Sequence, residues 1–496
     1  MHLLSKSRFL SGRQCELKLY FDLFRRDLKS PISEKQKLLF SGGNQVGKLA
    51  HSYFPDGKDA SPESFYDYSE SIQKTKDWIQ KGETTIYEAA FEEEKVLCAL
   101  DILHQNNDER WAIEVKGSTT VKGYYLEDAA LQYWVMNKAG CAPDKFFILH
   151  VNNKYHLADA FEVSEYFKMK DITRDVLRLQ PMVETVIPRL KQMVENKNQP
   201  DCTIGPHCHQ PFSCDYRHHC WKKIPEPSVF DLYRANGKDW DLYNQGITSL
   251  QEIPDNYPLN KRQSLQVKGS RSFLQHIETD FIKNFLDKLS FPLYFLDFET
   301  IAPAIPILKG TRPFEQIPFQ YSLHIVREDF SVSHNQFLAE HESFIDGAED
   351  PRLVLLRQLI TELEKNGSIV AYNAQFEKMI LKNLAKAFPE FSTEIQNLLI
   401  RFADLLKVFD SAAYYTSDMG NSASIKNVLP AIDKKFSYED LPVSNGGEAS
   451  HLFLRMVLGE IQDNTDEIRN HLLKYCERDT EGMVVIWKHL AHLIEN

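Results

Sequence analysis

The sequence predicts a mixed α/β fold in two domains joined by a small helical connector. Its 496 residues exceed what one compact core usually holds. Strands followed by helices appear twice, on either side of a middle stretch interrupted by glycine and proline. A content of 43% hydrophobic and 26% charged residues is that of a globular protein. We therefore place the domains at 1–225 and 289–496 and the connector at 226–288.

The first domain begins its α/β pattern with three consecutive strands of apolar and β-branched residues. A helix, a fourth strand and a long amphipathic helix are expected to follow. In chain order these six elements are 85–91, 96–103, 111–115, 128–137, 145–150 and 171–196.

The second domain opens with a strongly apolar strand and continues with two alternating strands, a helix and a short buried strand. The rest of the chain has mainly helical periodicity. The first five elements are 293–298, 319–326, 331–337, 353–363 and 368–372.

The bulk composition narrows the class of protein. A net charge of −12 argues against a general nucleic-acid coat protein, but metal-binding acids contribute to such a charge, so a nuclease stays open. We find no run of about 18 apolar residues, so no membrane span is predicted. The N-terminus lacks the apolar core and cleavage site of a signal peptide, which makes a cytoplasmic location the expectation.

Two carboxylates stand at the end of the first strand of the second domain. Asp297 and Glu299 are two residues apart, so strand alternation sends both side chains to one face. Mg²⁺ is held by a few carboxylates and retained waters. Two such ions about 4 Å apart clamp the attacking and leaving oxygens of a phosphodiester. This pair predicts one part of a two-metal site.

Two later motifs supply the other part. In Asn373-Ala-Gln-Phe-Glu377 the acid lies on a helix that follows the strand at 368–372. In Tyr475-Cys-Glu-Arg-Asp479 the tyrosine and the aspartate share one face of a predicted helix. Asp404 is an additional acid for which a helix-capping role is expected.

The order of these motifs resembles the DnaQ-like exonucleases of the ribonuclease H-like fold, in the subclass with a tyrosine in the last motif. The resemblance implies that Tyr475 orients the attacking water. It also implies that four acids bind two metals: Asp297, Glu299, Glu377 and Asp479. The second motif of that family usually ends in aspartate, so Glu377 is a departure that would shift one metal contact.

A second acidic set lies in the first domain. Asp101 ends one predicted strand, and Glu114-Val-Lys116 ends the next, so Asp101 and Glu114 are placed to hold one ion. Lys116 points the same way as Glu114, where an ammonium can stabilise the charge that develops on a phosphorane.

This second set resembles the PD-(D/E)XK nucleases, which have a restriction-endonuclease-like fold. Gly47-Lys-Leu-Ala-His51 and Gln132-Tyr133 are similar to additional motifs of their RecB-like branch. The resemblance implies that His51 supports or joins the metal site. It implies that Gln132 and Tyr133 contact DNA or position Lys116.

Cysteines form a third group. Cys208, Cys214 and Cys220 recur every six residues, and Cys15 lies far upstream. One early cysteine and three late ones resemble the iron–sulfur RecB-like nucleases, including the AddB type. The resemblance implies that a 4Fe–4S cluster ties the two ends of the domain together. Cys202 is assigned no role.

Zinc remains an alternative for the cysteines, and unliganded thiols are another. Zn²⁺ accepts mixed sulfur and nitrogen ligands, and four histidines lie within the same segment. They are His207, His209, His218 and His219.

Taken together, the motifs resemble the bacterial two-nuclease proteins of the domain-of-unknown-function 2779 family. Further segments that carry this resemblance are Gln316-Ile-Pro-Phe-Gln320 and Ser424-Ile-Lys-Asn-Val-Leu-Pro430. We expect a metal-dependent phosphodiester hydrolase with two active sites that use Mg²⁺ or Mn²⁺. The expected partner is DNA, single-stranded or with free ends. RNA as substrate, and a non-catalytic nucleic-acid-binding protein with relic sites, are the alternatives.

Overall fold

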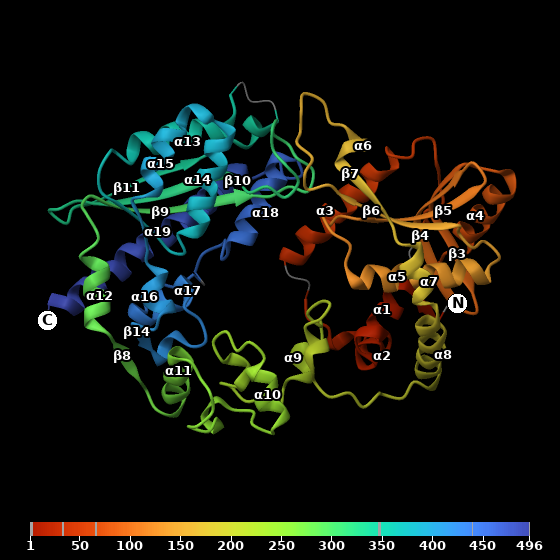
Figure 1. The fold of residues 1–496 in the computed structure, drawn as a ribbon, viewed down its shortest axis with the longest axis horizontal. Helices are drawn as coiled ribbons and strands as arrows, with labels where there is room; N and C mark the ends of the chain where they lie inside the picture. The colour runs from red at the N-terminus through yellow and green to blue at the C-terminus, as the bar shows by residue number, and fades with distance from the viewer. Residues whose placement is uncertain (1–2, 32–33, 65–66, 346–348, 439, 496) are drawn as a thin grey trace. The chain divides into compact units, whose positions relative to one another are not determined.

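The computed structural model describes residues 3–31, 34–64, 67–345, 349–438 and 440–495. The chain divides into two compact units, each a mixture of helices and strands (Figure 1). The first unit comprises Met1–Lys223 with Ala304–Phe314, and the second comprises Ile224–Pro303 with Glu315–Asn496. The connector predicted at 226–288 falls within the second unit.

A seven-stranded sheet organises the first unit. Its strands lie in the order β2-β3-β4-β5-β6-β7, and β1 pairs with β4. The strands predicted in this domain are all confirmed, with slightly longer bounds. The strands are β1 (Leu4–Ser5), β2 (Lys58–Asp59), β3 (Thr85–Glu93), β4 (Val96–Asn106), β5 (Glu109–Lys116), β6 (Lys145–Val151) and β7 (Phe167–Asp171).

Helices cover both faces of this sheet. Helices α1, α5 and α8 contribute to the apolar core on one face, and α3 contributes to the core on the other. The bounds are α1 (Lys6–Gln14), α2 (Glu16–Phe24), α3 (Glu34–His51), α4 (Ser69–Lys81), α5 (Gly123–Lys138), α6 (Val163–Tyr166), α7 (Thr173–Arg178), α8 (Gln180–Asn196) and α9 (Arg217–Cys220).

The single helix predicted at 171–196 is wrong, because the structure divides it into α7 and α8. Pro181 lies in the first turn of α8. A proline has no amide hydrogen and its ring clashes with the carbonyl four residues earlier, so an uninterrupted helix is disfavoured there.

The pairing of β4 brings the N-terminus of α1 to the middle of the sheet. Strand β4 pairs with β1 at Val96 and Leu97, and with β5 from Ile102 onward. Between these two stretches lies Asp101, which has no ladder partner on β5. Lys6 follows β1 directly, so α1 begins beside this gap.

The second unit is built on a five-stranded sheet with the order β11-β10-β9-β12-β13, and β14 and β8 form a separate ribbon. Strands β9, β10 and β11 are antiparallel neighbours, whereas β12 runs parallel to β9 and β13. The strands predicted here are confirmed. The bounds are β8 (Gln275–Ile277), β9 (Leu293–Ile301), β10 (Ile317–Val326), β11 (Val332–Leu338), β12 (Ser368–Ala371), β13 (Phe402–Asp404) and β14 (Tyr414–Thr416).

The two faces of β9 have different roles. Tyr294, Leu296 and Phe298 pack into an apolar core with α13, α14 and α15. Because side chains alternate along a strand, Asp297 and Glu299 lie on the opposite face, where α19 packs along β9 and β10.

The helices of this unit include the one predicted at 353–363, which is confirmed as α13. Their bounds are α10 (Lys238–Asn244), α11 (Lys261–Arg271), α12 (Thr279–Leu286), α13 (Pro351–Glu362), α14 (Gln375–Ala387), α15 (Ser392–Leu399), α16 (Leu406–Asp410), α17 (Ile425–Ile432), α18 (Gly446–Val457) and α19 (Thr465–Glu495).

Gly482 lets α17 approach α19 closely, because a Cβ atom at this position would lie 2.5 Å from Leu429 Cδ2. We predict that Gly482→Ala destabilises the second unit by about 1–3 kcal/mol through overpacking. The midpoint of denaturant-induced unfolding measures this. Gly123→Ala is the control, because its added methyl group meets nothing within 4 Å. Equal midpoints for both variants would contradict the close approach.

Candidate functional sites

Three carboxylates of the second unit converge on one point. Asp297 and Glu299 come from β9 and Asp479 from α19, and one oxygen of each lies within 4.8 Å of the other two. Neighbouring oxygens bound to one Mg²⁺ at 2.0–2.1 Å lie about 3 Å apart. A small contraction would therefore bring this set to a coordinating geometry.

Glu377 reaches the same region through the turn after β12. Asn373 adopts a left-handed conformation with φ of 72°, which asparagine tolerates better than most residues. The backbone amide of Asn373 donates a hydrogen bond to Asp404 Oδ1 at 3.0 Å. The chain then enters α14, which carries the buried Glu377.

One oxygen of Glu377, Oε2, is buried and has no hydrogen-bond partner among the described residues. A buried acceptor left without a donor is unfavourable, and a cation would satisfy it. This oxygen therefore fits the divalent ions expected from the sequence.

Asp404 was expected to cap a helix; its carboxylate binds backbone amides, but the N-cap residue of α16 is Leu405. Besides the amide of Asn373, Asp404 Oδ1 accepts a hydrogen bond from the amide of Leu406, at the start of α16, at 3.2 Å. Its charge still raises the pKa of Glu377, so it lies close enough to affect the site.

The electrostatics of the cluster follow from burial. Burial, and then repulsion by Asp479, raises the pKa of Glu299 to about 8 and that of Asp297 well above its ordinary value. Burial also raises the pKa of Glu377 to about 8 and that of Asp479 to about 6. The acids repel one another in a dry setting, which is where a divalent cation is most strongly attracted.

Tyr475 lies beside these acids, and the structure adds two residues that the sequence did not single out. Burial and the charge of Asp479 raise the pKa of Tyr475, so its hydroxyl stays protonated. Tyr438 Oη donates to Asp479 Oδ1 at 2.5 Å. The ammonium of Lys426 lies 5.0 Å from the ring centre of Tyr438 and 5.2 Å from that of Tyr475. Lys426 lies within Ser424–Pro430, a segment that carries the family resemblance, so the sequence could have indicated it as a site residue.

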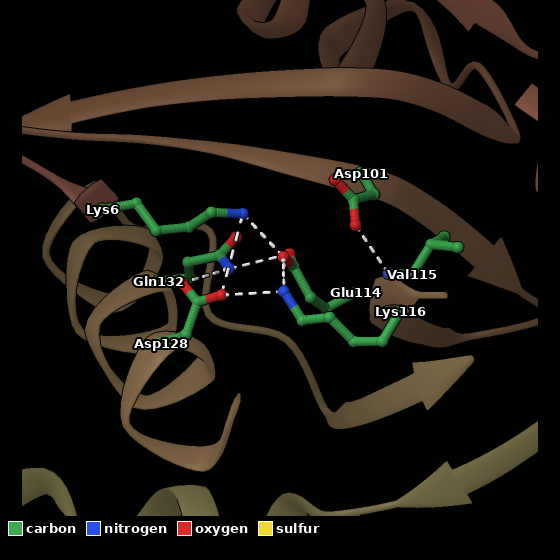
Figure 2. Close-up of polar contacts among 7 residues, drawn as sticks. All are labelled: Lys6, Asp101, Glu114, Val115, Lys116, Asp128 and Gln132. Carbon is green, nitrogen blue, oxygen red and sulfur yellow. Dashed lines mark hydrogen bonds and ion pairs between the residues drawn. The ribbon is translucent and has the colours of Figure 1, made fainter. Parts of the chain in front are cut away.

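In the first unit Glu114 is the centre of a buried polar network (Figure 2). Lys6 and Lys116 each donate to Glu114 Oε1 at 2.6 Å. Gln132 donates to Glu114 Oε2 at 2.8 Å. Lys116 also donates to Asp128 Oδ2 at 3.0 Å. The structure thus brings together Glu114, Lys116 and Gln132 from the predicted set.

Asp101 lies where β4 and β5 separate. Its Oδ2 accepts a hydrogen bond from the amide of Val115 at 2.6 Å, in place of a ladder contact (Figure 2). Glu88 of β3 is an additional acid nearby, and its backbone is left-handed with φ of 52°. The sequence could have indicated Glu88, because it is an acid in the middle of the apolar strand predicted at 85–91.

Charge is balanced differently in this network. Burial alone would raise the pKa of Glu114, but Lys116 and Lys6 outweigh it and lower that pKa to about 2. Burial, and then repulsion by Glu114, raises the pKa of Asp101 to about 6. Burial and the charge of Asp101 raise the pKa of Glu88 to about 8. A cation bound beside Asp101 and Glu88 would therefore relieve repulsion between the acids of this network.

His51 has a packing partner of its own. Its ring stacks on Tyr87 with a centroid separation of 3.9 Å and an interplanar angle of 3°. Burial lowers its pKa, so the ring is neutral at neutral pH. Tyr133 packs at the edge of the apolar core that α5 contributes to.

All four predicted cysteines, together with Cys202, line one cavity in the first unit. Burial, and then the neighbouring Cys202, raises the pKa of Cys15 to about 12. Cys202, which the sequence analysis assigned no role, therefore lies beside Cys15, and it stands six residues before Cys208.

The spacing of the thiols bears on the choice of metal. In a tetrahedral zinc site with Zn–S of 2.3 Å, the sulfur atoms lie about 3.8 Å apart. Among the described residues, no three cysteine or histidine ligand atoms of this segment lie within 4.8 Å of one another. The cysteines are free thiols in this structure, so the iron–sulfur cluster and the zinc alternative both stay predictions.

The four histidines near these cysteines have separate surroundings. His207 lines the cavity, and His218 Nδ1 is 2.8 Å from Ser30 Oγ. His209 contacts the ring of Trp221, and His219 contacts that of Phe21.

Fold and sites together define a mixed α/β protein with two carboxylate clusters and one cysteine-lined cavity. Residues 294–424 match the family described as "Domain of unknown function (DUF2779)". For that stretch, this confirms the resemblance to the domain-of-unknown-function 2779 family, while the two-nuclease character stays a prediction. The stretch includes Asp297, Glu299 and Glu377.

Curated relatives are similar to part of the chain. "Uncharacterized protein MG366 homolog" of Mycoplasma pneumoniae is 29% identical over 231 residues, which is 43% of this chain and 34% of the relative. "Uncharacterized protein UU173" of Ureaplasma parvum is 26% identical over 235 residues, covering 42% and 32% respectively. The chain spans about a third of the length of these relatives. Among the described helices, none has the length and apolar character needed to cross a membrane.

The raised pKa values predict how pH and metal act on stability. The pKa of Glu299 rises from 4.5 to about 8, so the folded chain holds this proton more tightly than the unfolded chain does. Its contribution to stability is full below pH 4.5 and is lost as the pH rises to about 8. Bound Mg²⁺ must displace such protons, so we predict a larger Mg²⁺-induced rise in Tm at pH 8 than at pH 6.

Thermal unfolding of wild type and Glu299→Gln measures this effect. The substitution removes the titrating group, so the difference between the two pH values should shrink in the variant. A Mg²⁺-induced shift that is the same at both pH values in the wild type would contradict the prediction.

Proposed function

We propose that the protein is a metal-dependent nuclease that hydrolyses phosphodiester bonds in DNA. It would combine a RecB-like PD-(D/E)XK half with a DnaQ-like exonuclease half of the ribonuclease H-like fold. The observation that carries the proposal is the convergence of Asp297, Glu299 and Asp479, with ligand oxygens within 4.8 Å of one another.

In the second unit the acids would hold the metals and the tyrosine would act on water. Bound divalent ions polarise the phosphate and lower the pKa of water. Asp297, Glu299, Glu377 and Asp479 supply carboxylate oxygens for them, which suits Mg²⁺ or Mn²⁺. The protonated hydroxyl of Tyr475 orients the attacking water, and Tyr438 holds Asp479 in place.

In the first unit Asp101 and Glu114 would hold a metal, with Glu88 as a further acid. Lys116 keeps its proton, because Glu114 and Asp128 outweigh the effect of burial on its pKa. It therefore serves as a cation for the developing phosphorane charge rather than as a base. Lys6 competes for the same oxygen of Glu114, so this half works only once that contact loosens.

The cysteine-lined cavity would hold a 4Fe–4S cluster. Cys15 belongs to the N-terminal end of the first unit, whereas Cys208, Cys214 and Cys220 belong to its C-terminal end. A cluster bound to both ends would stabilise the folded unit through ligation.

Degradation of end-labelled single-stranded DNA with Mn²⁺ tests the nuclease proposal. We predict that Asp297→Asn lowers terminal degradation by at least a hundredfold, because it removes a charged ligand from the metal site. Lys116→Gln should remove the activity of the first unit. Asp329→Asn and Lys145→Gln are matched controls, since Asp329 is exposed, Lys145 is half-buried against Glu109, and both lie outside these clusters.

The pattern of products separates the alternatives. Tight DNA binding without metal-stimulated cleavage would favour a non-catalytic binding protein. Cleavage of RNA but not of DNA would assign the activity to RNA, where the 2′-OH decides access. Wild-type cleavage by both Asp297→Asn and Lys116→Gln would refute the assignment of both sites.

The cluster has its own test. Protein purified without oxygen should be brown and contain about four irons per chain. Cys214→Ser should lose the colour and unfold at a lower temperature, whereas Cys141→Ser, outside the cavity, should keep both properties. Colourless wild-type protein with stoichiometric zinc would overturn the iron–sulfur assignment.

A further inference from the structure

A second group of metal-ligating side chains lies in the second unit, outside the carboxylate cluster. His324 of β10, His334 of β11 and Glu477 of α19 each offer a ligand atom, and these atoms lie within 4.8 Å of one another. The two imidazole rings stack with a centroid distance of 4.4 Å. Glu477 Oε1 is 3.6 Å from His334 Nδ1.

The other nitrogen of each ring is already engaged. His324 Nδ1 is 2.8 Å from Thr480 Oγ1, and His334 Nε2 is 2.9 Å from Ser322 Oγ. The two hydroxyl groups are themselves 2.7 Å apart. Histidines that ligate metals usually bind through one nitrogen while a hydrogen bond to the other fixes the ring. Here both rings are fixed in this way.

We infer that His324, His334 and Glu477 form a binding site for one divalent transition metal, with zinc as its best occupant. Two imidazoles and one carboxylate are a recurrent ligand set for Zn²⁺, with a fourth position left to water. Ligand atoms at 2.0–2.1 Å in a tetrahedral site lie about 3.4 Å apart, so a contraction of at most about 1.4 Å closes the site.

Burial supports this set. It lowers the pKa of His324 to about 4, with His334 as the second cause, so the ring is neutral and keeps a lone pair at neutral pH. His324 is buried, whereas the side chain of Glu477 is 44% exposed. An ion can therefore enter from the exposed side, and nitrogen ligands distinguish the site from the all-oxygen cluster.

The site would fix the helix that completes the carboxylate cluster. Glu477 lies between Tyr475 and Asp479 on α19, and Ser322 is opposite Asp297 in the β9–β10 ladder. A metal bound here would tie α19 to β10 and β11. It would therefore hold Tyr475 and Asp479 in register with β9 whether or not the cluster is catalytic.

Equilibrium dialysis of the full chain against Zn²⁺, with excess Mg²⁺ to fill the carboxylate cluster, tests the inference. Bound zinc is counted by mass spectrometry. His334→Ala should bind one zinc fewer per chain than the wild type. Glu477→Gln, at a half-exposed position, should weaken this zinc by tenfold or more, and Thr480→Val should weaken it by about 10- to 100-fold.

Glu481→Gln is the matched control, because it removes the same charge from the same helix near His334 but offers no ligand to the group. It should bind zinc like the wild type. Thermal unfolding separates failed folding from lost binding, since zinc should raise the Tm of the wild type and of Glu481→Gln more than that of Glu477→Gln. Equal zinc binding by wild type, His334→Ala and Glu477→Gln would overturn the site.

Discussion

The second unit depends on one electrostatic constraint, the crowding of carboxylates on the α19 face of β9. Asp297, Glu299 and Asp479 present oxygens within 4.8 Å of one another; Glu299 and Asp479 are buried and Asp297 is half-buried. Burial raises the pKa of all three acids, and repulsion by Asp479 raises the pKa values of Asp297 and Glu299 further. Such an arrangement persists in a folded protein when a ligand of opposite charge compensates it.

The first unit meets a similar demand in another way. Glu114 is compensated from within the chain by Lys6 and Lys116, each 2.6 Å from the same oxygen. Asp101 is held by a backbone amide instead, and its pKa is raised. The two units thus differ in how ready they are for metal. Among the described residues, no pair of lysines donates to the acids of the second unit in this way; under the proposed function, the first unit would have to release or share Lys6.

The main strands and the pairing of neighbouring site residues could be predicted from the sequence, because local residue patterns determine them. Strand alternation placed Asp297 with Glu299, and helical periodicity placed Tyr475 with Asp479. Contacts between distant segments could not be predicted in the same way. Lys6 reaches Glu114 only because β1 pairs with β4, and Tyr438 reaches Asp479 from a loop. The histidine group needs β10, β11 and α19 together, so no single stretch of sequence indicated it. The helix at 171–196 was expected to be continuous because its apolar spacing concealed the effect of Pro181.

Under the proposed function, the converging acids of the second unit bind a pair of divalent cations. Anomalous diffraction from crystals soaked in Mn²⁺ tests it most directly. We predict two peaks about 4 Å apart among Asp297, Glu299, Glu377 and Asp479. Well-ordered carboxylates with no manganese between them, at a concentration that saturates any activity, would contradict it.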